Sequence, residues 1–376
     1  MATCVSQGPP ICGFWLTQEW SRHDVTDPGP PGPAECPTLS HSILPTLIHR
    51  GYLALGFFQI ANRYSLSPAD TLISRNNKAL DYQHRLVRAI EPLDVSSARK
   101  RKLLSLIGVG PCPSLILLSD AAARIEASNL LCQCTAEFVE ANVSDGRRMF
   151  HLTFADDIGL TSDRTPTLRF AAMNRKVDNA IRFMGLSGLA MSEVQPLVNY
   201  PRHGRGRTLM LNSHALCWGD VSRRGFRESL RTLNHSRSWS NRFGALPIKS
   251  RELHNGADDA HLIASYIAKM PSDAKRLVPR GSQFPGEFRF APTTEGYSAR
   301  LALRVAEGLS HYTVFDAVFG VNEGKYVRKA WKAQLLAWHS HRLVRCGQRS
   351  SFNVERMWQH VRERVGPDIY APYQLE

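Results

Sequence analysis

Alternation of apolar and polar positions predicts strands in the middle of the chain. In "RRMFHLTFAD", Phe150, Leu152 and Phe154 fall on one face and His151 and Thr153 on the other, which is the period of a strand. The segments "GLAMSEVQPL" and "RTLMLNSHALCWG" have the composition of two more strands, joined as a hairpin by the basic loop "NYPRHGRGR". A fourth strand is predicted in "ALPIKSREL".

Apolar residues at three- and four-residue spacing predict helices between these strands. They are "TPTLRFAAMNRKVDNAIRFMG", the amphipathic "SRRGFRESLRTL" and "ADDAHLIASYIAKM", the last of which Pro271 ends. The resulting order is β-α-β-β-α-β-α, with a hairpin at its centre. This order favours an α+β fold, with an antiparallel-cored sheet of the split βαβ type and flanking helices, over a doubly wound sheet.

The same patterns divide the rest of the chain into regions. Residues 1–40 have the composition of a flexible Pro-rich leader, 41–140 form a helical N-terminal region, and 145–285 hold the predicted strands. Residues 295–376 return to helical periodicity and are a candidate DNA contact. One apolar stripe in this last region is assigned to ordinary core: Val327, Trp331, Leu335 and Trp338.

Charge adds a class of partner to this picture. The 376 residues include 47 Lys and Arg against 33 Asp and Glu, and the net charge of +14 favours a polyanion such as nucleic acid. No apolar stretch approaches the roughly 20 residues of a membrane helix, and the N-terminus lacks a basic segment followed by an apolar one. We therefore expect a cytoplasmic protein without a membrane partner. The eight scattered Cys fit reduced thiols, and Cys132 and Cys134 lack the second pair of a zinc finger.

Two predicted elements carry residues with catalytic chemistry. In the apolar strand "LMLNSHALCWG", Asn212 and His214 point the same way, so one strand presents two metal-ligand atoms side by side. In the helix containing "SYIAK", Tyr266 and Lys269 share a face about one turn apart. A tyrosine hydroxyl, with an ordinary pKa of about 10, is a poor nucleophile until a cation activates its target.

Each of these residues by itself has a common structural explanation, as a core histidine, a packed aromatic or a solvated helix end. In order, the motifs "HLTF", "LNSHALCWG" and "YIAK" resemble those of rolling-circle replication initiators of the HUH endonuclease superfamily, over about residues 145–280. The resemblance implies a metal-assisted attack by Tyr266 on single-stranded DNA, with Lys269 beside it, and a covalent 5′-phosphotyrosine intermediate. From the order of the elements, we also expect the preceding strand "ALPIKSREL" to run beside the strand of His214 and to bring the hydroxyl over the cation.

The metal ligands carried over from the resemblance depart from the family pattern at one position. His214 falls on the second histidine of the family motif, whereas Asn212 replaces the first and Ser213 the hydrophobic residue between them. An Asn amide oxygen suits a hard cation, so Mg²⁺ or Mn²⁺ is expected. Glu193 is the best candidate for a third ligand, with His151 behind it.

Basic segments supply candidate DNA contacts. Arginines on the outer face of a helix neutralise phosphates, an exposed Trp stacks on an unpaired base, and glycines in a basic loop let its backbone approach a phosphate. The candidates are Arg223, Arg224, Arg227 and Arg231 in "SRRGFRESLRTL", Trp239 after it, and Arg202 and Arg205 in "RHGRGR".

The sequence thus predicts an initiator that nicks and rejoins one strand at a plasmid or phage origin. Because no P-loop motif occurs, strand separation needs a host helicase, and synthesis needs a host polymerase. No second tyrosine lies within a turn of Tyr266, which argues against a paired-tyrosine mechanism. Two alternatives stay open: a mobilisation relaxase or transposase of the same superfamily, and a non-catalytic DNA-binding or replication-control protein that has lost metal chemistry through Asn212.

Overall fold

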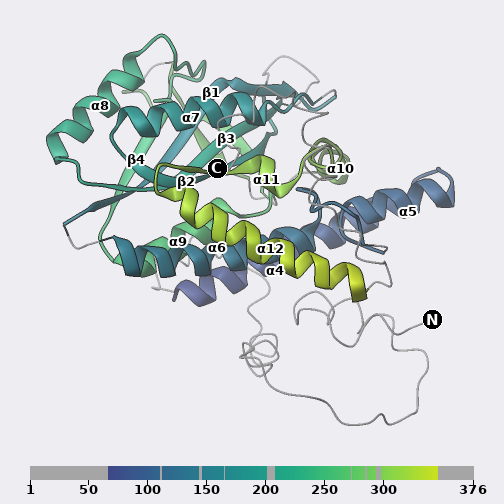
Figure 1. Ribbon diagram of the computed structural model, residues 1–376. Helices are drawn as coiled ribbons and strands as arrows, with labels where there is room; N and C mark the ends of the chain where they lie inside the picture. Colours follow the sequence, from purple (N-terminus) through teal and green to yellow (C-terminus); the bar gives the residue numbers. More distant parts are fainter. Residues whose placement is uncertain are drawn as a thin grey trace.

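The computed structural model of the chain describes residues 67–345 apart from 111, 144–145, 165, 201–207, 272, 284–285 and 294–297. These residues form a mixed α/β fold in which helices flank a seven-stranded mixed sheet (Figure 1). The strand order is β4-β1-β3-β2-β5-β6, and β7 also pairs with β2. The predicted leader and the last predicted helix, at 353–365, lie outside the described residues.

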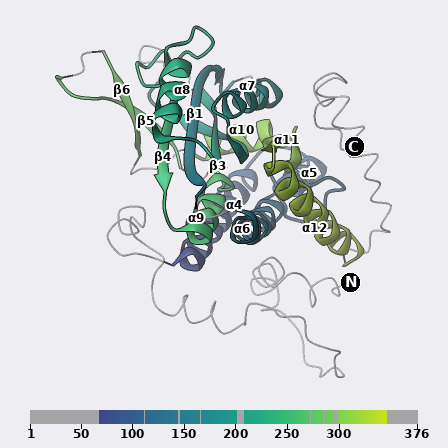
Figure 2. The ribbon, with the colours of Figure 1, turned by 60° about the vertical axis from the view of Figure 1, so that its left-hand side comes forward.

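The central strands are those that alternation predicts. Pairings are antiparallel except between β2 and β5, and the predicted β-α-β-β-α-β-α order is confirmed. Figure 2 shows the β5–β6 hairpin, which the sequence did not predict, projecting from the body. The strands are β1 (Arg148–Ser162), β2 (Ser187–Leu197), β3 (Thr208–Gly219), β4 (Ile248–Leu253), β5 (Lys275–Pro279), β6 (Phe288–Pro292) and β7 (Val318–Val321).

Most helices begin at a side chain that accepts a hydrogen bond from a free backbone N–H of the first turn, as Ser67, Asp120 and Ser222 do. The helices are α4 (Pro68–Ile90), α5 (Ser97–Leu106), α6 (Ala121–Asn142), α7 (Phe170–Phe183), α8 (Arg223–His235), α9 (Gly256–Ile267), α10 (Ala299–Leu309), α11 (Val314–Ala317) and α12 (Gly324–Arg345). In Figure 1, α7 and α8 lie on one side of the sheet and α4, α6 and α9 on the other.

The alternation in β1 assigns its residues to these two layers. Phe150 and Phe154 face α7 and α8: the Phe150 ring stacks on Phe226 of α8 with centroids 4.0 Å apart. His151 and Thr153 point to the opposite face, which α9 covers by packing on β2 and β3. One face of the sheet is therefore an apolar core, while the other carries polar side chains beneath a helix.

A buried hydrogen-bond chain explains the serine in the apolar strand β3. Ser213 lies on the α7 face, where its hydroxyl is 2.6 Å from that of Ser192, which donates to Asn174 Oδ1 on α7 at 2.7 Å. All three residues are buried. Because each buried hydroxyl has a partner, Ser213 is tolerated at a position where the sequence pattern leads us to expect a hydrophobic residue.

Side chains from all three of the predicted regions that the structure describes meet in one hydrophobic cluster, while the buried apolar residues of α4 belong to a second. A single cluster of buried side chains includes Ile116, strand residues such as Leu152 and Leu211, and the predicted stripe from Val327 to Trp338. The assignment of that stripe to core is confirmed, since Trp331 and Leu335 are fully buried. The segment after residue 295 also contributes strand β7, so the C-terminal helices are part of the same fold.

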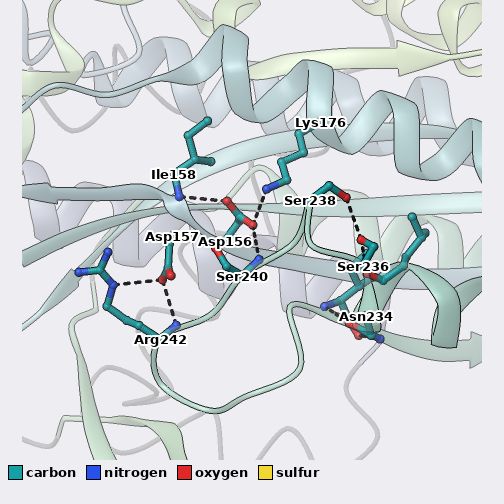
Figure 3. Close-up of polar contacts among 11 residues, drawn as sticks. Asp156, Asp157, Ile158, Lys176, Asn234, Ser236, Ser238, Ser240 and Arg242 are labelled. Carbon is teal, nitrogen blue, oxygen red and sulfur yellow. Dashed lines mark hydrogen bonds and ion pairs between the residues drawn. The ribbon is translucent and has the colours of Figure 1, made fainter.

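An irregularity in β1 anchors the loop that follows α8. The pairing of β1 with β3 shifts register between Ala155 and Leu160, which turns Asp156 inward. The Asp156 carboxylate accepts hydrogen bonds from the Ser240 N–H, at 2.9 Å, and from the Lys176 ammonium, while Asp157 accepts from Arg242 (Figure 3). These contacts fix the loop between α8 and β4 against the sheet.

The arrangement expected around Tyr266 is wrong in two details. Strand β4 pairs with β1 rather than with the strand of His214, because β1 lies between them in the sheet. Helix α9 ends at Ile267, so Lys269 follows the helix instead of sharing its last turn. A turn continues the winding of the chain, since the Lys269 N–H donates to Tyr266 O at 3.4 Å.

Candidate functional site

Three of the predicted metal ligands converge on the face of the sheet beneath α9. Asn212 of β3 and Glu193 of β2 are cross-strand partners, and His214 lies two positions along on the same face. His214 Nε2 is 3.0 Å from Glu193 Oε1, and Asn212 Nδ2 is 3.0 Å from His214 Nε2 and 3.3 Å from Glu193 Oε1. All three side chains are buried.

Several polar atoms of this cluster have no hydrogen-bond partner among the described residues. They are Glu193 Oε2, Asn212 Oδ1 and Nε2 of His151. His151 stands on β1 with its ring centroid 5.5 Å from that of His214. Thr153 holds the other side of the His214 ring, with its hydroxyl 3.1 Å from Nδ1. Unsatisfied buried polar atoms are uncommon in proteins, and three of those among the described residues lie in this one cluster, while others occur elsewhere.

The donor set fits a small divalent cation. Rotating the Asn212 side-chain amide by 180° places Oδ1 where Nδ2 now lies, so that an oxygen faces His214 and Glu193. When the Nδ1–H of His214 donates to the Thr153 hydroxyl, Nε2 of the same ring has a lone pair free to bind a metal ion. Adjacent ligands of a Mg²⁺ ion at roughly 2.1 Å lie about 3 Å apart, close to the separations in this cluster. Across the part of the chain described, no group of three or more His, Cys, Asp and Glu has a metal-binding arrangement; this set combines two such residues with an asparagine.

Tyr266 lies against the same cluster. Its ring meets the rings of His214 and His151 edge-on, with centroids 4.9 and 5.4 Å away. The Lys269 ammonium lies 3.9 Å from the centroid of the tyrosine ring and 2.7 Å from Glu193 Oε1. The structure thus brings together the residues that the sequence predicts for catalysis and for metal binding, although they belong to four separate elements.

Lys269 and Glu193 hold each other in the charged state. Burial opposes the charge on Glu193, but Lys269 and His214 outweigh this effect and hold the pKa of the carboxyl well below its ordinary value. Burial likewise opposes the charge on Lys269, but Glu193 and Tyr266 raise the pKa of its ammonium above the ordinary value. A carboxylate and an ammonium therefore persist side by side in a buried site.

Both histidines are neutral. Burial lowers the pKa of His151 to about 3, and the positive charge of Lys269 adds to this effect. Burial also lowers the pKa of His214, reinforced by Lys269 and opposed by Glu193. Neutral imidazole is the form that binds metal ions, so the electrostatics suit the proposed ligand role.

The predicted DNA contacts lie elsewhere. Helix α8 exposes Arg223, Arg224, Arg227 and Arg231. This helix covers the face of the sheet opposite to Tyr266, because Phe226 of α8 packs on Phe150. Arg202 and Arg205 lie outside the described residues.

The prediction that Trp239 stacks on an unpaired base is wrong for this conformation. The side chain is 6% exposed and packs in the core, with its ring 5.6 Å from that of Phe154. The Lys176 ammonium lies 4.6 Å from the centroid of the Trp239 ring. The loop held by Asp156 buries this residue, so it contributes to stability instead of presenting a surface to bases.

Cations that the sequence interpretation missed lie on the tyrosine side of the sheet. Lys249 and Arg251 of the edge strand β4 are exposed and pair with Thr153 and His151, so their side chains share the face of the site. The spacing of Lys and Arg two positions apart in "IKSREL" could have indicated that both lie on one face of this strand. Arg75 of α4 also reaches Tyr266, with Cζ 5.2 Å from the centroid of the ring, and no local pattern indicated it.

Comparison of the chain with protein-family models, with curated proteins and with solved structures finds no match. Among the described residues, no helix is long and apolar enough to cross a bilayer. The functional interpretation therefore depends on the geometry of the site itself.

Proposed function

We propose that the protein nicks and rejoins single-stranded DNA through Tyr266, with Mg²⁺ or Mn²⁺ bound by Glu193, Asn212 and His214, and that it initiates rolling-circle replication at a plasmid or phage origin. In this proposal the chain is a single-tyrosine relative of the HUH endonucleases. Host helicase and polymerase supply strand separation and synthesis.

The observation that carries the proposal is the contact between Tyr266 and the ligand cluster. The tyrosine ring lies 4.9 Å from the ring of His214, on the face of the sheet where Glu193 and Asn212 meet. A packed structural tyrosine has no need of an unsatisfied buried carboxylate oxygen and amide oxygen beside it. The antiparallel centre β1–β3–β2 also agrees with the sheet that the resemblance implies.

The reaction balances without an external energy source. Tyr266 Oη attacks phosphorus and loses its proton to solvent, the bond from phosphorus to the 3′ oxygen breaks, and that oxygen takes up a proton from solvent to leave as a 3′-hydroxyl. A bound divalent cation withdraws charge from the phosphodiester and so makes phosphorus more electrophilic. Lys269 steadies the developing charge near the tyrosine ring. Attack by a 3′-hydroxyl on the phosphotyrosine reverses these steps and restores the phosphodiester.

A covalent adduct tests the proposal. Single-stranded oligonucleotides that tile the replicon encoding this chain, labelled at their 3′ ends, are incubated with the protein and Mn²⁺ and then separated on denaturing gels. Because the 5′ phosphate of the downstream fragment stays on Tyr266, the 3′ label should migrate with the protein. Tyr266→Phe removes only the hydroxyl and should abolish the labelled band while folding is retained.

Tyr326 offers a matched control, because it is the 68% exposed tyrosine of α12, remote in sequence from the cluster. Tyr326→Phe should form the adduct as the wild type does. An adduct that survives Tyr266→Phe assigns the nucleophile to another residue, and a wild-type protein that labels with none of the oligonucleotides contradicts the nicking activity.

One observation favours a second function, that of a non-catalytic DNA-binding protein. Lys269 already neutralises Glu193 through a contact of 2.7 Å, so the carboxylate has a counter-ion without any metal. If the protein binds single-stranded DNA, forms no adduct and gains no stability from Mn²⁺, this second function replaces the first.

A further inference from the structure

Helix α4 extends the site with an arginine from outside the strand-containing region. Arg75 Nη1 donates to Leu262 O of α9 at 3.0 Å and to the hydroxyl of Ser265, and its guanidinium carbon lies 5.2 Å from the centroid of the Tyr266 ring. All three partners belong to α9. Arg75 therefore reaches the proposed nucleophile through a contact between helices that are far apart in sequence.

Cations outnumber carboxylates around this tyrosine. Lys269 pairs with Glu193, whereas Arg75 and Arg124 form no ion pair with any carboxylate in the described residues. Arg124, which is 3% exposed, donates to the backbone oxygen of Lys269. Three cations thus share a single carboxylate, and such an excess of buried positive charge favours binding of an anion.

The neighbouring thiol does not supply the missing negative charge. Burial raises the pKa of Cys132, the thiol that interacts electrostatically with Arg75, to about 12, so it stays protonated. Burial lowers the pKa of Arg75 to about 10, which still leaves its guanidinium charged near neutral pH. The excess of positive charge is therefore present under ordinary conditions.

Arg75 also has donors to spare. A guanidinium carries five N–H groups in a planar fork that matches two oxygen atoms of a phosphate. Only Nη1 hydrogen-bonds a described residue, which leaves the N–H groups on Nε and Nη2 available. Arg75 is half-buried, so part of its surface is open to solvent.

We propose that Arg75, placed at the Tyr266 ring by α4 and left without a carboxylate partner, binds a phosphate of the DNA strand that Tyr266 attacks. The class of ligand, a phosphodiester of single-stranded DNA, depends on the proposed nicking function; the anion site itself does not. The N-terminal helices are then one wall of the substrate site.

Binding of inorganic phosphate tests the anion site without requiring any reaction. Titration at constant ionic strength, followed by ³¹P line broadening and by thermal shift, should show saturable binding to the wild type. Arg75→Ala should weaken it about tenfold or more, the loss of a charge-assisted hydrogen bond, and Arg75→Lys less. Arg85→Ala, which removes an exposed arginine from the same helix, should leave binding unchanged.

Adduct formation then separates phosphate binding from a purely structural role. Arg75→Ala should slow adduct formation, and millimolar guanidinium should restore part of the rate by entering the space left by the side chain. Circular dichroism checks that each variant is folded. If the alanine variant is not folded, Arg75→Lys replaces it in both measurements. Phosphate binding unaltered by both substitutions overturns the proposal. If the wild type binds phosphate through Arg75 but forms no adduct, the anion site stands and the nicking function fails.

Discussion

The Lys269 ammonium lies 2.7 Å from Glu193 Oε1, and His214 Nε2 lies 3.0 Å from the same oxygen. The lysine thus occupies the carboxylate oxygen that the proposed metal site requires. Cation binding and the Lys269–Glu193 ion pair should therefore compete.

Replacing Lys269 by Met should make the protein less stable without metal and more responsive to Mn²⁺. Removing one partner of a buried ion pair costs roughly 3–5 kcal/mol, because the remaining charge is left buried. Mn²⁺ should return much of that stability, with an affinity at least about tenfold above that of the wild type, since the repulsion by the ammonium is gone. Thermal unfolding across a Mn²⁺ titration measures both effects.

The double variant Glu193→Gln/Lys269→Met is the control for this experiment. It removes both charges together, so its stability should be closer to that of the wild type and should not respond to Mn²⁺. Equal Mn²⁺ responses in all three proteins would contradict a cation site at Glu193.

Single-stranded DNA should bind with a strong salt dependence to which α8 contributes. Arg227 and Arg231 are exposed and lie one turn apart. Replacing both by Ala should reduce the slope of log affinity against log salt by about 1.4, or about 0.7 for each lost phosphate contact. Fluorescence anisotropy of a labelled oligonucleotide at several salt concentrations measures the slope.

Removing the same number of positive charges from another helix shows whether α8 itself contacts the DNA. Arg85 and Arg88 of α4 are also exposed, and their double alanine variant should keep most of the wild-type slope. If it loses as much as the α8 variant, net charge governs binding. Lys249→Ala/Arg251→Ala, on the edge strand that shares the face of Tyr266, tests whether the DNA path crosses β4.

Stability should fall as the pH drops from about 6.5 to about 4, in part because of His339. This fully buried side chain lies with Nε2 3.3 Å from Ser114 O, and burial lowers its pKa to about 4, with a further contribution from Arg342. Above about pH 6.5 the His339 imidazole is neutral in both the folded and the unfolded chain, so this histidine causes no loss of stability. Below it the unfolded chain takes up the proton first, which costs the folded state up to roughly 3 kcal/mol by pH 4.

Chemical denaturation at a series of pH values measures this loss. His339→Gln keeps a donor for Ser114 O but cannot titrate, so its stability should depend less on pH over the same range. The exposed His84→Gln is the control for removal of an imidazole and should retain the wild-type profile. Equal slopes for wild type and His339→Gln would mean that another group causes the loss.

Elements with a long, unambiguous period could be predicted from the sequence, and so could the residues that they present. Alternation in β1 and the placement of Asn212 and His214 on one face follow from local pattern alone. Strand β7 is four apolar residues directly after a helix, and β5 and β6 have five residues each and end in Pro, so none has enough length to show a period.

Pairing and tertiary contact were harder to predict, because they depend on distant parts of the chain. Nothing in "ALPIKSREL" indicates whether β4 joins β1 or β3, and Arg75 stands in a polar helical segment that gives no sign of a contact with Tyr266. The burial of Trp239 depends on Asp156, which binds its loop through a backbone N–H. Sequence reasoning predicted the helix that carries Tyr266 but not the contact that α4 makes with it through Arg75.

Strand β7 has a consequence for the nascent chain. Gly188 and Met191 of β2 pair with Val321 and Val318, which are synthesised long after them. Until then, the β2 edge facing away from β3 offers unpaired backbone groups, which can pair with other chains and aggregate. A chain interrupted before Val318 keeps that edge open permanently. The last described segments are therefore as necessary for a soluble translation product as the strands that carry Glu193, Asn212 and His214.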